Sequence, residues 1–265
     1  MSSDHRAAEA AALLATARRD RQPITSLPDS CLPQDIDQAY AVQRAFVEHQ
    51  LQDEGGAAIG YKIGCTNALA QDLLGVDEPF YGRILSSSVL TSGAALRREQ
   101  VSLCCIEAEL AFEMAEGLPA AAAPYDPDGV ASAVAHLMGA IEIVDSRFTD
   151  WTGVGATALI ADNGCAGNWI KGVGLAQWQH LELDQLSVEL VVNDRVARSG
   201  SGADVMEHPL NALAWLANVL CFSGGMLKAG DVVSTGTMID VYFAEPGDRL
   251  QARFEGLGEV ALNVE

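Results

Sequence analysis

Basic residues are scarce in this chain of 265 residues. It has 16 lysines and arginines against 36 aspartates and glutamates, which gives a formal net charge of −20 at pH 7. This charge repels nucleic-acid phosphates and anionic lipid headgroups, so we expect neither nucleic acid nor a membrane as a partner. Long hydrophobic runs are also lacking. The longest, 210–222, is interrupted by Asn211 and Asn218 and is too short to span a bilayer.

A secretion signal is missing from the N-terminal segment. Residues 1–20 include Asp4 and Glu9, and arginines follow the alanine-rich stretch, which reverses the order of a signal peptide. We therefore expect a cytoplasmic protein. The six cysteines form no CxxC pair and no Cys/His zinc pattern, so we expect reduced and mostly buried thiols.

Helical patterns fill the start of the chain. Residues 6–19 are rich in alanine, and apolar residues recur at helical spacing from Ile36 to Leu51, with Asp35 as a cap and Gly55-Gly56 as the stop. Two later helices are expected, from Asp128 to Ile141 and from Pro209 onward.

Short β-like runs follow Gly56, punctuated by Gly, Pro and Asp. They are 58–63, 88–90, 106–112, 186–192, 231–234, 249–254 and 260–264. The expected fold is α+β, with a helical N-terminal lobe (1–75) and a β-rich catalytic domain (76–265). The glycine-rich run 153–158 nearly fits a dinucleotide-binding fingerprint, but the residues before it predict a turn and not the required strand.

Three glutamates lie in apolar surroundings. In a strand over 106–112, Glu107 and Glu109 point to one face, and Glu142 lies inside an aliphatic run. Three carboxylates without a nearby histidine favour Mg²⁺ or Mn²⁺ over zinc. The alternative is a solvated strand face for Glu107 and Glu109, with Glu142 at the mouth of a surface helix.

Lys62 is another polar residue in a β-like segment. A lysine near a metal can have a lowered pKa and serve in proton transfer, and the alternative is a lysine on a surface strand. Residues 234–237 follow a strand, and their hydroxyls and amides could hold a carboxylate, or could simply end the strand. Asp145 and Arg147 could form an internal ion pair that fixes the loop after Glu142.

Taken together, these segments resemble the hydratase/decarboxylase branch of the fumarylacetoacetate hydrolase superfamily. The segments that carry the resemblance are 60–67, 75–79 with Tyr81-Gly82, 106–109, 142–147, 161–163, 209–217 and 229–237. The resemblance covers most of the chain. It implies a mixed β-fold with a helical N-terminal region, a homo-oligomer, and metal binding by Glu107, Glu109 and Glu142.

The same resemblance implies a Mg²⁺- or Mn²⁺-dependent lyase that acts on a small 2-oxo or 2-hydroxydienoic acid from aromatic meta-cleavage. The main expectation is a hydratase of the 2-hydroxypenta-2,4-dienoate type, with Lys62 as the catalytic residue. The residues expected to bind substrate are Phe80, Asn163, Cys165, Thr235, Gly236 and Thr237.

Two departures from the family pattern keep alternatives open. Phe80 stands where many hydratases have Asp, and Cys165 follows 161–163 where Ser is frequent. These changes favour a 4-oxalocrotonate-type decarboxylase, whereas Trp151 and Asp162-Asn163 favour a hydratase. An acylpyruvate C–C hydrolase is another alternative. A further alternative is an impaired paralogue that serves as an interaction subunit in a decarboxylase/hydratase complex.

The substrate's tail is not determined by these residues. A dicarboxylate would need a second cation, which Arg83 or Arg147 could supply, although a structural ion pair is the stronger expectation for Arg147.

Overall fold

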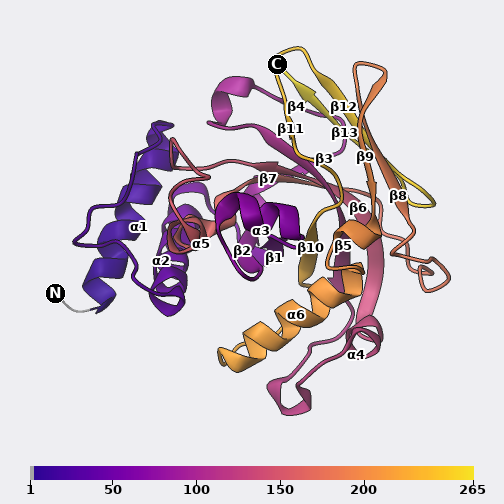
Figure 1. Cartoon of the computed structure of the whole chain (residues 1–265), viewed down its shortest axis with the longest axis horizontal. Helices are drawn as coiled ribbons and strands as arrows, with labels where there is room; N and C mark the ends of the chain where they lie inside the picture. Colours follow the sequence, from indigo (N-terminus) through magenta and orange to yellow (C-terminus); the bar gives the residue numbers. More distant parts are fainter. Residues whose placement is uncertain (1–2) are drawn as a thin grey trace.

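The computed structural model describes residues 3–265. Two helices come first in the chain and lie side by side, and the strands that follow them form two β-sheets (Figure 1). Helix α1 spans Ser3–Asp20 and α2 spans Ile36–Glu54, so both predicted helices are confirmed. The Asp35 side chain caps α2 by accepting a hydrogen bond from the backbone N–H of Gln38 at 2.8 Å. The helix ends at Gly55, whose φ of 75° favours glycine.

The larger sheet has eight strands, and the site lies on it. In spatial order, its main path is β2 (Phe80–Leu85), β1 (Ala58–Gly64), β10 (Val232–Thr237), β5 (Cys105–Met114), β6 (Val134–Val144), β7 (Ala166–Lys171) and β3 (Val89–Thr91), and β11 (Tyr242–Phe243) also pairs with β5. Among the described strands of this larger sheet, only the β1–β10 and β3–β7 pairs are parallel. The central β5–β6 pair is antiparallel, and its register runs from Cys105 opposite Val144 to Met114 opposite Val134.

A second sheet of five strands packs on the first. Its order is β4 (Ala94–Leu96), β13 (Gly258–Val264), β12 (Arg249–Phe254), β8 (Ser187–Val192) and β9 (Arg195–Ser201). Gly139 of β6 lies against Phe254 of β12, where an added Cβ would come within 2.3 Å of the ring. Glycine therefore permits the close approach of the two sheets.

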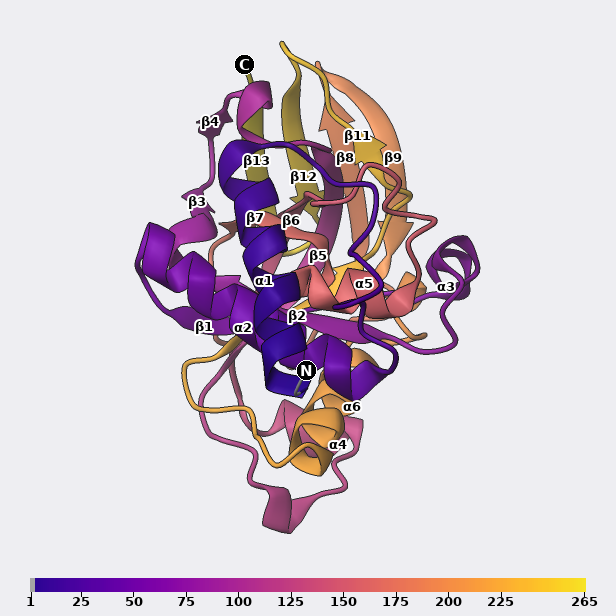
Figure 2. The ribbon, with the colours of Figure 1, turned by 90° about the vertical axis from the view of Figure 1, so that its left-hand side faces the viewer.

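Short helices connect the strands. They are α3 (Ala68–Leu74), α4 (Pro127–Ala131), α5 (Ala156–Ala161), α6 (Pro209–Phe222) and the 3₁₀ turns Ser86–Ser88, Arg98–Gln100, Ala120–Ala122, Asn163–Cys165 and Gly202–Asp204. The predicted helix at Pro209 is confirmed. In Figure 2, α1 faces the viewer, with α2 and the strands of the large sheet behind it.

The predicted helix from Asp128 to Ile141 is wrong. Helix α4 stops at Ala131, and the rest of the segment is β6, which pairs with β5 on one side and β7 on the other. The apolar spacing was misleading because β6 is a central strand that is buried on both faces.

Several strands were not predicted from the sequence, because they are short or interrupted by polar and glycine residues. They are β2, β4, β7, β9 and β11. The boundary near residue 75 stays a prediction; β1, which precedes it, pairs with β10 in the large sheet.

In the glycine-rich run, turns and not a strand precede α5, as expected. Across residues 3–265, no helix has the length and hydropathy required to cross a bilayer.

Candidate metal and active site

Three glutamate side chains meet on one face of the large sheet. Glu107 and Glu109 are two residues apart on β5, so their side chains point to the same face. Glu142 on β6 is the direct cross-strand partner of Glu107. One carboxylate oxygen from each residue lies within 4.8 Å of the others. Glu109 and Glu142 are buried and Glu107 is half-buried, so the alternative of a solvated face and a helix mouth is wrong for Glu109 and Glu142.

The carboxylates perturb one another strongly. Burial raises the pKa of Glu142 to about 7, with Lys62 opposing the rise and Glu107 adding to it. Burial, together with the charges of Glu142 and Glu107, raises the pKa of Glu109 well above its ordinary value. Burial also raises the pKa of Glu107. A cation among them would relieve this repulsion.

The oxygen atoms of this cluster fit a hard divalent cation. Within the described chain, Glu109 Oε1 and Glu142 Oε2 are buried and have no hydrogen-bond partner. Carboxylate oxygens are the ligands that Mg²⁺ and Mn²⁺ prefer. Cys105 precedes Glu107 on the same strand face, but burial raises the pKa of its thiol and keeps it protonated.

Lys62 of β1 is the cation beside the cluster. Its Nζ lies 3.2 Å from Glu142 Oε1 and donates a hydrogen bond of 2.7 Å to the carbonyl oxygen of Gly164. The side chain is buried, so the surface-strand alternative is wrong. Burial lowers the pKa of Lys62, but Glu142, Glu107 and Glu109 together raise it above its ordinary value. This rise in pKa belongs to the site without an ion, because the lysine faces three carboxylates; the lowered pKa expected beside a bound metal stays a prediction.

The loop that presents Gly164 has an unusual backbone. Asn163, Gly164 and Cys165 have φ values of 55°, 61° and 58°, in the left-handed region. The Asn163 side chain accepts a hydrogen bond from the backbone N–H of Arg83 at 2.7 Å and donates one to its carbonyl at 3.0 Å. These bonds tie the loop to β2 and so offset the strain.

A buried ion pair braces the same loop. Arg147 Nε donates to Asp162 Oδ1, while its Nη2 and Nη1 donate to the carbonyls of Asp162 at 2.5 Å and Ala166 at 2.9 Å. The structural ion pair expected for Arg147 is present. Its predicted partner was wrong, because Asp145 accepts backbone hydrogen bonds from residues 102 and 103 instead.

The segment 234–237 holds a carboxylate of the protein itself. The Ser234 hydroxyl and the Gly236 backbone N–H, the latter at 3.1 Å, both donate to Glu109 Oε2. Thr235 Oγ1 donates instead to the Leu110 carbonyl at 2.9 Å. Thr237 Oγ1 donates to the carbonyl of residue 239.

A small cavity of about 80 Å³ adjoins the cluster at Lys62 and Glu107. Phe80, Cys165 and Thr237 line it, whereas Asn163, Thr235 and Gly236 do not. The structure thus brings three of the six expected substrate-binding residues to this cavity. The roles of all six stay predictions.

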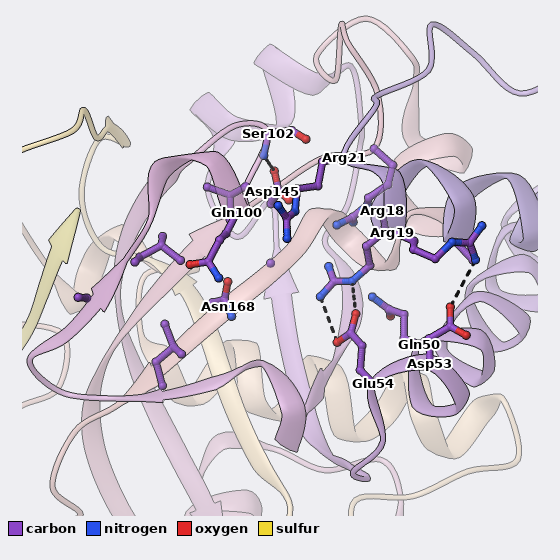
Figure 3. Close-up of a pocket in the computed structure, with 17 residues that line it drawn as sticks. Arg18, Arg19, Arg21, Gln50, Asp53, Glu54, Gln100, Ser102, Asp145 and Asn168 are labelled. Atoms are coloured by element: carbon purple, nitrogen blue, oxygen red, sulfur yellow. Dashed lines mark hydrogen bonds and ion pairs between the residues drawn. The ribbon is translucent and has the colours of Figure 1, made fainter. Parts of the chain in front are cut away.

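A larger cleft of about 620 Å³ lies elsewhere, between the ends of α1 and α2 and the segment 95–102 (Figure 3). Arg18 pairs with Glu54 at 2.7 Å and Arg19 with Asp53 at 3.8 Å on its helical side. None of the three glutamates lines this cleft, so cavity size is a poor guide to the chemistry here.

Sequence reasoning missed several supporting residues. Trp169 Nε1 donates to Ser234 Oγ at 3.1 Å, which orients the hydroxyl toward Glu109. Thr66 lies against Gly236, where an added Cβ would come within 2.1 Å of Thr66 Oγ1. The hydroxyl-rich segment 234–237 was a usable signal for Ser234, and Thr66 lies in the segment 60–67 that carries the resemblance. Trp169 gave no signal, because only long-range strand pairing brings it to this site.

Comparisons with known proteins agree with this geometry. The family model described as fumarylacetoacetate (FAA) hydrolase C-terminal matches residues 40–265. The chain is 33% identical to 2-keto-4-pentenoate hydratase 2 of Dechloromonas aromatica, over 95% of each chain. It is 32% identical to 2-keto-4-pentenoate hydratase of Burkholderia vietnamiensis, over 98% of each chain.

A solved structure shares the complete fold. The 4-oxalocrotonate decarboxylase from Pseudomonas putida G7, complexed with magnesium and adipate, superposes with a TM-score of 0.92 at 25% identity, covering 100% of this chain and 99% of the other. The full-length match and the family model lead to one conclusion: this chain belongs to the fumarylacetoacetate hydrolase family.

Proposed function

We propose that this protein is a divalent-metal-dependent lyase that hydrates a 2-hydroxydienoic acid of the 2-hydroxypenta-2,4-dienoate type in aromatic catabolism. The observation that carries the proposal is the cluster of Glu107, Glu109 and Glu142 with two unpartnered buried oxygens beside Lys62. Relatives named as 2-keto-4-pentenoate hydratases support this choice of reaction.

The three glutamates would hold Mg²⁺ or Mn²⁺. When bound, such an ion supplies Lewis-acid stabilisation of negative charge on the 2-oxygen of a 2-oxo acid. Ser234 and Gly236 fix one oxygen of Glu109 and leave the other free for the ion.

Lys62 is the proposed proton-transfer residue. Its ammonium is held by Glu142 and by the Gly164 carbonyl, and it borders the cavity next to Glu107. From there it can donate a proton to the dienoate or stabilise the enolate oxygen by a hydrogen bond. Phe80, Cys165 and Thr237 line the space available to the rest of the substrate.

A decarboxylase is the second candidate, because the structure with a TM-score of 0.92 is a decarboxylase and because the Phe80 ring, which lines the cavity, is apolar and can neither orient water nor transfer a proton. A dry pocket favours loss of CO₂ over delivery of water. Acylpyruvate cleavage is a further candidate. An impaired interaction subunit is disfavoured, because Lys62 and all three glutamates are present and assembled.

The deciding experiment is a substrate panel with Mg²⁺ or Mn²⁺ and identification of products by mass. A 2-hydroxydienoate should gain the mass of water. Loss of CO₂ from 4-oxalocrotonate, or cleavage of an acylpyruvate, would replace the hydratase assignment. Glu109→Gln run in parallel should abolish any genuine turnover.

Location and assembly complete the proposal. A cytoplasmic enzyme that forms homo-oligomers fits the acidic composition and the family, and a complex with a partner decarboxylase is an extension of it. Sedimentation of the purified protein, alone and with such a decarboxylase, tests both forms of association.

A further inference from the structure

We infer that the cleft of about 620 Å³ between the ends of α1 and α2 and the segment 95–102 is a second binding site, which takes a small organic acid that carries a hydroxyl group. Its volume lies in the range of ligand pockets, about 300–1,000 Å³. None of the three glutamates of the metal cluster lines it. The inference therefore goes beyond the proposed function and does not depend on it.

Arginines gather at this cleft, although the whole chain has a formal net charge of −20. Four of the 16 lysines and arginines of the chain line it, which are Arg18, Arg19, Arg21 and Arg147 (Figure 3). Guanidinium groups are well suited to binding carboxylates, because their N–H donors match the two carboxylate oxygens. The composition of the wall therefore favours an organic acid.

The acids that line the cleft are already engaged by the protein. Arg18 Nε lies 2.7 Å from Glu54 Oε1, and Arg19 Nη1 lies 3.8 Å from Asp53 Oδ2. The third acid, Asp145, accepts two backbone hydrogen bonds from residues 102 and 103. These contacts offset the negative charge of the wall, so that it does not exclude an anion.

Arg21 is the arginine of this wall with no protein partner for its guanidinium in the described part of the chain. Arg147, by contrast, is held by Asp162. Arg21 follows α1 with a φ of 52°, and the next N–H, of Gln22, donates to the Ala17 carbonyl at 3.0 Å. Glycine is the usual residue at such a helix end. The backbone therefore does not call for arginine here, whereas a carboxylate in the cleft would pair with it.

Gln50 is an independent indication of a ligand. It lines the cleft and is only 3% exposed, and its Oε1 has no hydrogen-bond partner among the described residues. Figure 3 shows its side chain beside those of Asp53 and Glu54. A buried acceptor without a donor is costly. A carboxylate cannot supply the missing hydrogen, but a hydroxyl group can, so the ligand carries both groups.

The cleft is closed toward the metal cluster. Gly167 and Asn168 line both the cleft and a space of about 10 Å³ that borders Lys62 and Glu142. A space of that size holds at most about one water molecule. An organic acid in the cleft therefore does not reach the glutamates by this route, and the two sites are distinct.

The test uses malate and succinate, which have the same carbon skeleton and differ by one hydroxyl group. The full-length protein is first freed of metal on a chelating resin, so that no ion can draw either acid to the glutamate cluster. Titration calorimetry then measures both affinities. Malate should bind, and succinate should bind at least about threefold more weakly, because it leaves the Gln50 oxygen unpaired.

Three variants locate the binding. Arg21→Gly removes the charge and suits the left-handed backbone, so it should fold and should weaken malate at least about tenfold. Arg195→Gln removes a charge from an exposed position on β9 outside the cleft and should change nothing. Gln50→Met replaces the unpaired acceptor by an apolar side chain of similar length, and malate should then lose its advantage over succinate.

Each contrary result would overturn the inference. These results are no binding of malate at millimolar concentration, equal effects of Arg21→Gly and Arg195→Gln, or an unchanged preference for malate in Gln50→Met. Binding that appears only after Mg²⁺ is added would place the acid at the glutamate cluster instead. None of these results touches the proposed function, which the substrate panel tests separately.

Discussion

Lys62 Nζ lies 3.2 Å from Glu142 Oε1, and this contact links two strands that are not neighbours in the sheet. Lys62 is on β1 and Glu142 on β6, with β10 and β5 between them. The lysine therefore spans the carboxylate cluster and offsets part of its charge. Its second hydrogen bond, to the Gly164 carbonyl, sets its position from the loop side.

Replacing Lys62 by methionine should separate proton transfer from metal binding. We expect Lys62→Met to lower kcat by roughly 10²–10⁴-fold, the usual contribution of a positioned acid or base. Metal affinity should not fall, because the carboxylates lose a competing cation. Steady-state kinetics and metal titration measure the two effects, with exposed Lys228→Met as the control. Turnover of Lys62→Met at the wild-type rate would remove its assigned role.

Glu109→Gln should lose metal affinity and activity together. The change removes a charged ligand, so the affinity should fall by more than the roughly 10–100-fold that is typical of an outer partner. Glu113→Gln is the matched control. Glu113 also lies on β5, but its carboxylate is outside the cluster and pairs with Lys171, with 2.9 Å between Oε2 and Nζ. Equal metal affinity in the two variants would contradict the ligand assignment.

The metal-free protein should lose stability as the pH rises. The folded pKa of Glu142 is about 7, above its ordinary value of 4.5, so folding favours the protonated carboxyl. Its contribution to stability is complete below about pH 4.5 and is lost as the pH rises through about 7. The melting temperature of chelated protein should therefore fall between pH 5 and 8, and Mg²⁺ or Mn²⁺ should flatten the slope. Identical slopes with and without metal would count against binding at this cluster.

Breaking the Arg147–Asp162 pair should act on the loop and through it on Lys62. Arg147→Met leaves Asp162 buried and unpaired, which should cost about 3–5 kcal/mol of unfolding free energy. Arg147→Lys keeps the charge but cannot make all three contacts, so we expect partial recovery of stability with a lower kcat and a similar KM. Denaturant unfolding and kinetics test this, with the exposed Arg249–Asp194 pair as a control worth at most about 1 kcal/mol. Wild-type kcat in Arg147→Lys would show that the pair is purely structural.

Phe80→Asp probes the water-addition step. Phe80 lines the cavity and lies close to Gly64, where an added Cβ would come within 2.9 Å of its ring. An aspartate there could orient water, so we expect more hydration relative to decarboxylation, with a lower melting temperature from the buried charge. Product masses and thermal melts are read together. A destabilised variant with an unchanged product ratio would contradict a role for Phe80 beside the substrate.

Local patterns were sufficient for much of this protein. Asp35 and Gly55 mark the ends of α2, and alternation along 106–112 places Glu107 and Glu109 on one face, because capping and the two-residue period of a strand are local properties. The order of motifs along the chain also identified the family that the full-length comparisons show.

Only the tertiary structure decided the rest. The apolar spacing up to Ile141 predicts a helix, but in the structure the segment is a strand that pairs with β5 and β7. That pairing places Glu142 opposite Glu107. The Arg147–Asp162 pair, the Gly164 carbonyl at Lys62 and the apolar cavity beside Phe80 join residues far apart in the chain. The sequence shows which polar and charged side chains would be costly to bury without a partner. Which residues become their partners depends on long-range strand pairing, and that pairing depends on how the whole sheet packs.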